Sequence, residues 1–296
     1  MCTRLFSFLA LDAPAWDARR LYAPRVHLFS SARASGQAHL LWKAFLVAYS
    51  LSVSIVNADL QGGPRYMTYL TVHGVWLTVA YFIASAACAA TAHWAPALAQ
   101  TPAYALHARA TQLLFAIALP FQLVIVTLYW LLLAQAQPSP LYVWDNLESH
   151  GLKAVLIWTD LLVGSMALPT PQLLVTLGAA LIYLVINLAV TLTSYPVYSV
   201  LKWNSGASAV LVLGALVYMV LAFFLAQTLA RVRDAWALQR AKRLHAGALL
   251  GAEEQDALYP LQFSDDGAAP CACSCAAARS AGGAQGSLLG DTEAQG

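Results

Sequence analysis

The sequence predicts an all-α, polytopic membrane protein: a bundle of six transmembrane helices with a disordered C-terminal tail. Three observations lead to this class. Of the 296 residues, 60% are hydrophobic, and the mean hydropathy is +0.62. Only 10% of the residues are charged, whereas soluble domains carry about 25% Asp, Glu, Lys and Arg. The apolar residues gather in six stretches, each close to the roughly 20 residues that a helix needs to cross a bilayer.

The six expected helices form one transmembrane domain over residues 39–232. Polar or Pro- and Gly-rich segments separate them, among them "DLQGGPR", "QPSPLYVWDNLES" and "LPTPQ". The fourth helix is the shortest, and its expected end at Pro169 is the weakest of the boundaries. The expected spans are 40–58, 66–91, 110–134, 151–168, 172–193 and 207–230.

Basic residues on both sides of this domain predict its orientation. Because cytoplasmic flanks of membrane helices carry an excess of Lys and Arg, both termini are expected in the cytoplasm. The protein itself is expected in the plasma membrane or an endomembrane. That requires an even number of spans, which agrees with six. The net charge is only +2 and no polybasic face is present, so membrane lipids rather than nucleic acid are the expected partners. The flanking basic residues are Arg4, Arg19, Arg20, Arg25 and Arg33 before the first span, and Arg231, Arg233, Arg240, Lys242 and Arg243 after the sixth.

The two tails differ in composition from the spans. Residues 1–38 mix arginines with large apolar side chains, which suits an amphipathic segment at the membrane surface. Residues 233–296 are first basic and then rich in Ala, Gly and Ser, which predicts disorder. Three cysteines in "CACSC" are candidates for acylation, whereas C-x-C-x-C without histidines is a weak metal motif and an unmodified tail stays open. These cysteines are Cys271, Cys273 and Cys275.

The few polar residues of spans two and four are expected to lie near one another. With a cytoplasmic N-terminus, both spans begin on the non-cytoplasmic side, so Thr71, His73, His150 and Lys153 fall at similar depths. Asp160 lies seven residues after Lys153, on the same helical stripe, and near the bilayer centre. A carboxylate there costs about 2.5–3.5 kcal/mol and should face the bundle or a wet cavity. The sequence therefore predicts a polar cleft between spans two and four.

Each of these side chains also has a purely structural interpretation. Thr71 can bond back to its own helical turn, His150 can cap the start of a helix, and Lys153 can anchor a helix at the membrane surface. Asp160 can be a packing residue that is bonded to another buried polar group. The candidate partners for Asp160 are Lys153, Gln122, Asn187 and Thr78.

Four motifs resemble the androgen-induced protein and rolling stone family of six-span membrane proteins. They are "YLTVHG" (69–74), "LPFQLVIVTLYW" (119–130), "DNLESHGLKAV" (145–155) and "PVYSVLKWNSG" (196–206). The resemblance depends on the order and placement of these motifs and covers roughly residues 68–230. The last motif is closest to the rolling stone branch.

The resemblance implies an intramembrane threonine hydrolase that cleaves fatty-acid esters of hydroxy fatty acids without a cofactor. Its nucleophile matches Thr71. The family's base is a histidine three residues after the start of an H-G pair, and this chain keeps His150-Gly151 but has Lys153 at that position. A threonine hydroxyl needs a base, and Lys153, His150 or His73 could serve. Rolling stone members generally lack the histidine and are linked to cell fusion and adhesion, so a non-enzymatic protein that binds lipid or a partner is the alternative.

Overall fold

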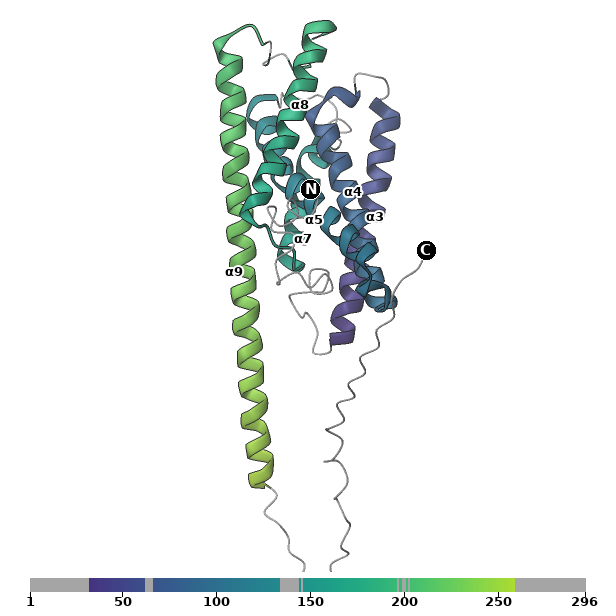
Figure 1. The fold of residues 1–296 in the computed structure, drawn as a ribbon, viewed down its shortest axis with the longest axis vertical. Helices are drawn as coiled ribbons and strands as arrows, with labels where there is room; N and C mark the ends of the chain where they lie inside the picture. The colour runs from purple at the N-terminus through teal and green to yellow at the C-terminus, as the bar shows by residue number, and fades with distance from the viewer. Residues whose placement is uncertain are drawn as a thin grey trace, which may run out of the picture. The chain divides into compact units, whose positions relative to one another are not determined.

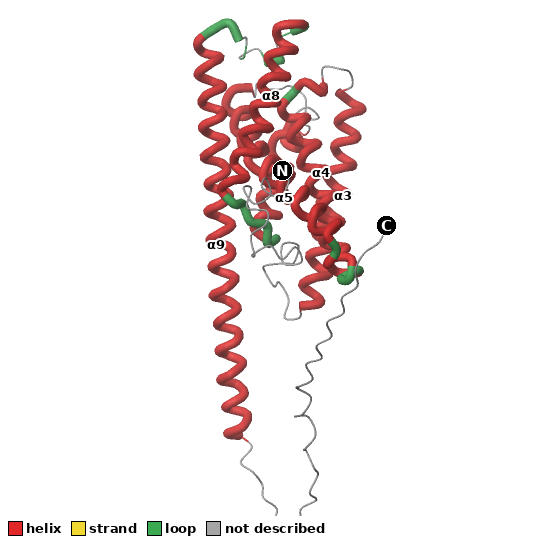
Figure 2. Tube along the Cα trace, in the orientation of Figure 1, coloured by secondary structure: helices red, strands yellow, loops and turns green. Residues whose placement is uncertain are grey.

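The computed structural model describes residues 32–61, 66–133, 144, 146–195, 197–198, 201 and 203–258, and every element within these ranges is helical (Figures 1 and 2). Five of the helices are long and apolar enough to cross a membrane. The predicted helical, membrane-embedded class is therefore confirmed, while the described residues contain five such helices and not six. These are α3 (Ala32–Gln61), α4 (Leu70–Trp94), α5 (Pro102–Leu128), α8 (Leu173–Thr193) and α9 (Gly206–Leu258).

The chain divides into two compact units, Met1–His245 and Ala246–Gly296. The second unit contributes only the final residues of α9 to the described part of the chain. The site and all contacts below belong to the first unit. The predicted N-terminal amphipathic segment lies almost entirely outside the described residues, as do Cys271, Cys273 and Cys275.

Helix α5 starts before its predicted span because a local capping signal extends it. Helix α5 begins at Pro102, eight residues before the expected start. Thr101 caps it, since the Thr101 hydroxyl oxygen accepts a hydrogen bond from the Tyr104 backbone N–H at 3.3 Å. Proline suits the first helical position because its missing N–H would have no partner there. Short 3₁₀ turns precede three helices: η1 (Tyr66–Thr68) before α4, η2 (Leu98–Gln100) before α5 and η5 (Thr170–Gln172) before α8.

The fourth predicted helix, 151–168, differs most from its expected form. It starts earlier, as a π-helical turn η4 (Glu148–Leu152), continues as α7 (Lys153–Val163) and ends at Gly164. Residues 165–169 are not helical, although Met166 and Leu168 are only 1% and 3% exposed. Gly164 and the following Pro169 break the helix, and the apolar composition of 164–168 concealed that break.

Side chains from neighbouring helices satisfy the carbonyl oxygens of this buried non-helical segment. Gln112 of α5 donates to the Ala167 oxygen at 3.0 Å, and Gln227 of α9 donates to the Leu168 oxygen at 2.6 Å. Arg233 of α9 donates to the Leu161 and Met166 oxygens. Irregular backbone at membrane depth is tolerated only when protein groups satisfy it, so these three side chains allow α7 to end inside the bundle.

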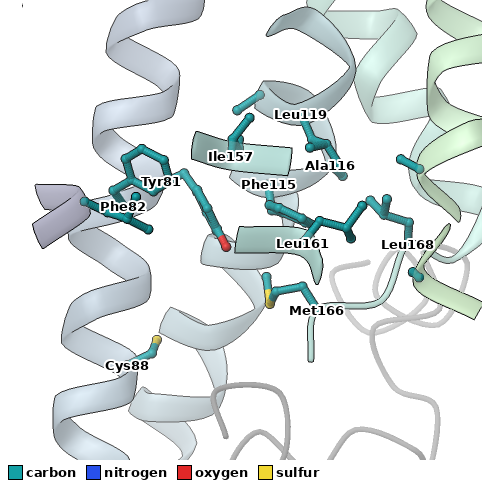
Figure 3. Close-up of a cluster of buried hydrophobic side chains, with 14 of the residues drawn as sticks. Tyr81, Phe82, Cys88, Phe115, Ala116, Leu119, Ile157, Leu161, Met166 and Leu168 are labelled. Atoms are coloured by element: carbon teal, nitrogen blue, oxygen red, sulfur yellow. The ribbon is translucent and has the colours of Figure 1, made fainter. Parts of the chain in front are cut away.

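The main hydrophobic core lies where α4, α5 and α7 meet. Figure 3 shows Tyr81 and Phe82 of α4, Phe115 and Leu119 of α5, and Ile157 of α7 converging there. All five are fully buried. Helix α4 packs most extensively against α5 and α3. This core fixes the relative positions of α4, α5 and α7, the three elements that supply the candidate site.

Gly74 lies where α4 packs against α5, one turn below Thr71. A Cβ atom at this position would clash with the Ile125 Cδ1 atom, and Gln122 lies 3.6 Å away. The Ile125 side chain therefore packs directly against the α4 backbone, and a larger residue at position 74 would require the end of that side chain to shift.

Candidate functional site

Thr71 and His150 meet in the structure. Thr71 lies in the first turn of α4, and His150 lies in the π-helical turn that precedes α7. The Thr71 Oγ1 atom is 3.3 Å from the His150 Nδ1 atom. The two residues are 79 positions apart in the chain. In this arrangement an imidazole nitrogen is next to a threonine hydroxyl, and a neighbouring base of this kind can take a hydroxyl proton.

An aromatic stack fixes the orientation of the His150 ring. The rings of Tyr129 and His150 are parallel within 4°, with centroids 3.6 Å apart. Tyr129 is the first residue of a second π-helical turn, η3 (Tyr129–Leu133), at the end of α5. Such turns are rare and occur frequently at functional sites. Two of them here bring their side chains into contact beside Thr71.

The contact fits one tautomer of a neutral His150 ring. A neutral imidazole has one nitrogen that can accept a hydrogen bond. In the tautomer with the proton on Nε2, the Thr71 hydroxyl donates to Nδ1. The 3.3 Å separation is longer than a tight hydrogen bond.

An apolar cleft begins at Thr71. Residues of α4, α5, α8 and α9 line it, and it is partly open to the surroundings. Thr71 and Tyr129 lie at one end, whereas Phe121 and Met219 lie deeper. Tyr129 and Phe121 are eight residues apart on α5, about 12 Å at 1.5 Å per residue. A cleft of this length and composition suits a hydrocarbon chain.

A rim of tyrosines holds the start of α4 in place. The Tyr198 hydroxyl oxygen accepts a hydrogen bond from the Leu70 N–H at 2.9 Å, and the Tyr183 hydroxyl donates to the Thr68 oxygen at 3.3 Å. Burial raises the pKa of Tyr198 well above 10, so it stays a neutral phenol. Trp203 donates to Asn187 at 2.9 Å and ties the segment after α8 back to that helix. These bonds position the turn that carries Thr71.

Lys153 faces away from Thr71, towards α3. Its ammonium nitrogen lies 2.7 Å from the Glu148 Oε1 atom and 3.3 Å from the Ser50 backbone oxygen. Both members of this ion pair are buried. The structure thus places His150, and not Lys153, next to the threonine.

Asp160 has partners that the sequence interpretation did not foresee. Its carboxylate accepts two hydrogen bonds from Lys43 of α3, at 2.6 and 2.8 Å, and one each from Trp42 and Tyr81. The expected partners were wrong: Gln122 donates to Thr78 and Asn187 to Tyr183, while Lys153 pairs with Glu148. Lys43 was missed although a lone lysine within an apolar span is a signal, since such a charge needs a buried partner.

His73 is not part of the Thr71–His150 contact. Its Nε2 atom lies 2.7 Å from the Met67 backbone oxygen, and its ring packs against the edge of Tyr183. It belongs to the opposite side of the α4 helix start, so it does not supply the base in this arrangement.

No protein-family model, curated protein or solved structure matches the chain. The function is therefore inferred from the geometry of the site.

Proposed function

We propose that this protein is an intramembrane hydrolase of fatty-acid esters. Thr71 is the nucleophile, His150 is its general base, and the apolar cleft receives an acyl chain. The observation that carries the proposal is the contact of Thr71 Oγ1 with His150 Nδ1, because Thr71 also lines that cleft. The resemblance to the androgen-induced and rolling stone family supports the same chemistry, and membership of that family is part of the proposal.

The reaction proceeds through an acyl-enzyme. His150 takes the Thr71 proton while Thr71 Oγ1 attacks the ester carbonyl carbon, and a tetrahedral oxyanion forms. The carbon–oxygen bond to the alcohol breaks, and His150 returns the proton to the leaving alkoxide. Water then attacks the threonine ester, with His150 again taking a proton and passing it back to Thr71. The net change is one ester and one water to one fatty acid and one alcohol.

The start of α4 can stabilise the oxyanion. Thr71 lies in the first turn of this helix, where backbone N–H groups have no partner within the helix. The positive end of the helix dipole is also located there. Hydrogen-bond donors aimed at a developing oxyanion are often the largest single contribution to such reactions. The Leu70 N–H is already bonded to Tyr198, so the Thr71 and Val72 N–H groups are the proposed donors.

The proposal retains six crossings with both termini in the cytoplasm. Five helices have the length and apolarity for a crossing. The sixth crossing is η4 with α7, 16 helical residues from 148 to 163, extended by the buried segment 164–169. With this crossing, Thr71 and His150 both lie near the non-cytoplasmic face, where water and a polar ester group can reach them.

Replacement of His150 by alanine tests the role of the base. We expect the hydrolysis rate of fatty-acid esters in detergent micelles to fall by about 10²–10⁴-fold, because that is the usual contribution of a general base. The matched control is His107→Ala, which removes an exposed imidazole bonded to the Ala84 oxygen. Equal rates in the wild type and His150→Ala would remove His150 from the mechanism.

The alternative is a protein that binds lipid in the same cleft without chemistry. The apolar side chains that line the cleft, among them Phe121 and Met219, favour this alternative. They can hold a hydrocarbon chain without any reaction at Thr71. A wild-type protein that retains a fatty-acid ester through purification but does not hydrolyse it would support this second function.

A further inference from the structure

The turn that carries His150 is closed by an ion pair of unusual spacing. In η4, the Lys153 backbone N–H donates to the Glu148 oxygen, the i to i+5 bond of a π-helical turn. The side chains of the same two residues form an ion pair at 2.7 Å. In a regular α-helix the partners on one face lie three or four residues apart. Glu148 and Lys153 are therefore linked twice, through backbone and side chains, only because the turn is π-helical.

The pair also attaches the turn to α3. Asn57 donates to the second Glu148 oxygen at 3.1 Å, and the Lys153 ammonium donates to the Ser50 oxygen at 3.3 Å. Glu148 and Lys153 are 1% and 0% exposed. His150 lies between these two anchored residues and points to the other side, towards Thr71 and Tyr129.

Stability alone does not account for this arrangement. Desolvation of a buried ion pair often cancels its attraction, and apolar residues of similar volume can pack as well. The clearest effect of the pair is on geometry. If the π-helical turn relaxed to an α-helical turn, its backbone hydrogen bond would span four residues instead of five. His150 would then rotate by about 100° relative to α7. That rotation would separate His150 from Thr71.

We propose that Glu148 and Lys153 form a clamp that maintains the π-helical turn and thereby aims His150 at Thr71. Lys153 is then a positioning residue, although it occupies the place of the base in the family that the chain resembles. This inference rests on the proposed hydrolase function. The buried Lys43–Asp160 pair has a different setting, since its carboxylate also accepts hydrogen bonds from Trp42 of α3 and Tyr81 of α4.

Lys153→His separates the clamp from the family's mechanism. A histidine side chain is too short to reach both Glu148 and the Ser50 oxygen, so the clamp predicts a fall of about 10²-fold in kcat, the cost of a misplacement of about 1 Å. The KM should change little, because the cleft is untouched. If position 153 is the site of the base, the same substitution should instead raise kcat, and that result would overturn the proposal.

A double variant controls for folding. Glu148→Leu with Lys153→Met leaves no unpaired buried charge, so the protein should unfold at a temperature close to that of the wild type. We expect the same loss in kcat, and we expect faster hydrogen–deuterium exchange at 148–153.

The outcomes separate the two proposals. A wild type that hydrolyses esters, together with a double variant of equal kcat and equal exchange, would overturn the clamp alone. A wild type without activity would refute the hydrolase. In that case the exchange measurement still decides whether the pair maintains the turn, since unchanged exchange would contradict the clamp directly.

Discussion

Thr71→Val is expected to abolish ester hydrolysis, with a loss of at least about 10⁴-fold in kcat. Valine has nearly the shape of threonine but no hydroxyl, so the helix and cleft remain while the nucleophile is removed. Loss of a nucleophile that acts together with its base commonly costs as much as loss of the whole catalytic group. The measurement is turnover of a fatty-acid ester by purified protein in detergent, compared with the wild type.

Two controls make this result specific. Thr71→Ser keeps a hydroxyl at the same position and should retain much of the activity. Thr228→Val removes an exposed α9 threonine whose hydroxyl donates only to the Phe224 oxygen at 2.8 Å, and it should leave the rate unchanged. Activity of Thr71→Val close to that of the wild type would mean that another residue attacks the ester.

Among the substitutions proposed for this protein, Asp160→Ala is expected to cause the largest loss of folding stability. It leaves the Lys43 ammonium buried without a counter-charge, and it removes the acceptor of Trp42 and Tyr81. Breaking a buried pair by removing one partner costs about 3–5 kcal/mol, a large share of the 5–15 kcal/mol that stabilises a typical protein. Thermal unfolding and the yield of monodisperse protein in detergent measure the effect.

The paired substitution Lys43→Met with Asp160→Leu tests the reason for that loss. It removes both charges and fills the space with apolar atoms, so most of the stability should return. If the double variant is as unstable as Asp160→Ala, the carboxylate contributes through its bonds to Trp42 and Tyr81 and not through its charge.

Composition predicted the helical membrane class. Thr71 and His150 are in contact, but the polar cleft expected between spans two and four is not what the described residues form. Lys153 and Asp160 turn to α3, and the cleft beside Thr71 is apolar and lined by α4, α5, α8 and α9. Thr71 and His150 were both candidates from the sequence. The contact between them was not predictable, since the helical phase at the start of α7 depends on a π-helical turn that hydrophobic periodicity does not reveal.

The partners of the charged residues were not predictable for a related reason. Lys153 and Asp160 are seven residues apart, and a common stripe suggested that they interact. Both side chains turn instead towards α3. There Lys43 pairs with Asp160, and the Ser50 oxygen accepts a hydrogen bond from Lys153. Asn57 donates to Glu148, the partner of Lys153. Which neighbour a helix face meets depends on how all helices pack, and one sequence carries no direct signal of that packing.

The end of the fourth span shows a further limit. Residues 164–168 are apolar enough to continue a helix, yet Gly164 ends α7 and the chain continues without helix to Pro169. The donors that make this possible, Gln112, Gln227 and Arg233, come from helices remote in sequence. A break at membrane depth is therefore a tertiary feature that hydropathy alone does not indicate.

The most direct test of the central claim is to locate the site of covalent attack. Purified protein is treated with a fluorophosphonate carrying a long alkyl chain, digested, and sequenced by mass spectrometry. The account predicts one adduct, on Thr71, formed by loss of fluoride from phosphorus and absent from His150→Ala. An adduct on any other residue, or no adduct in a protein that binds the probe, would contradict it.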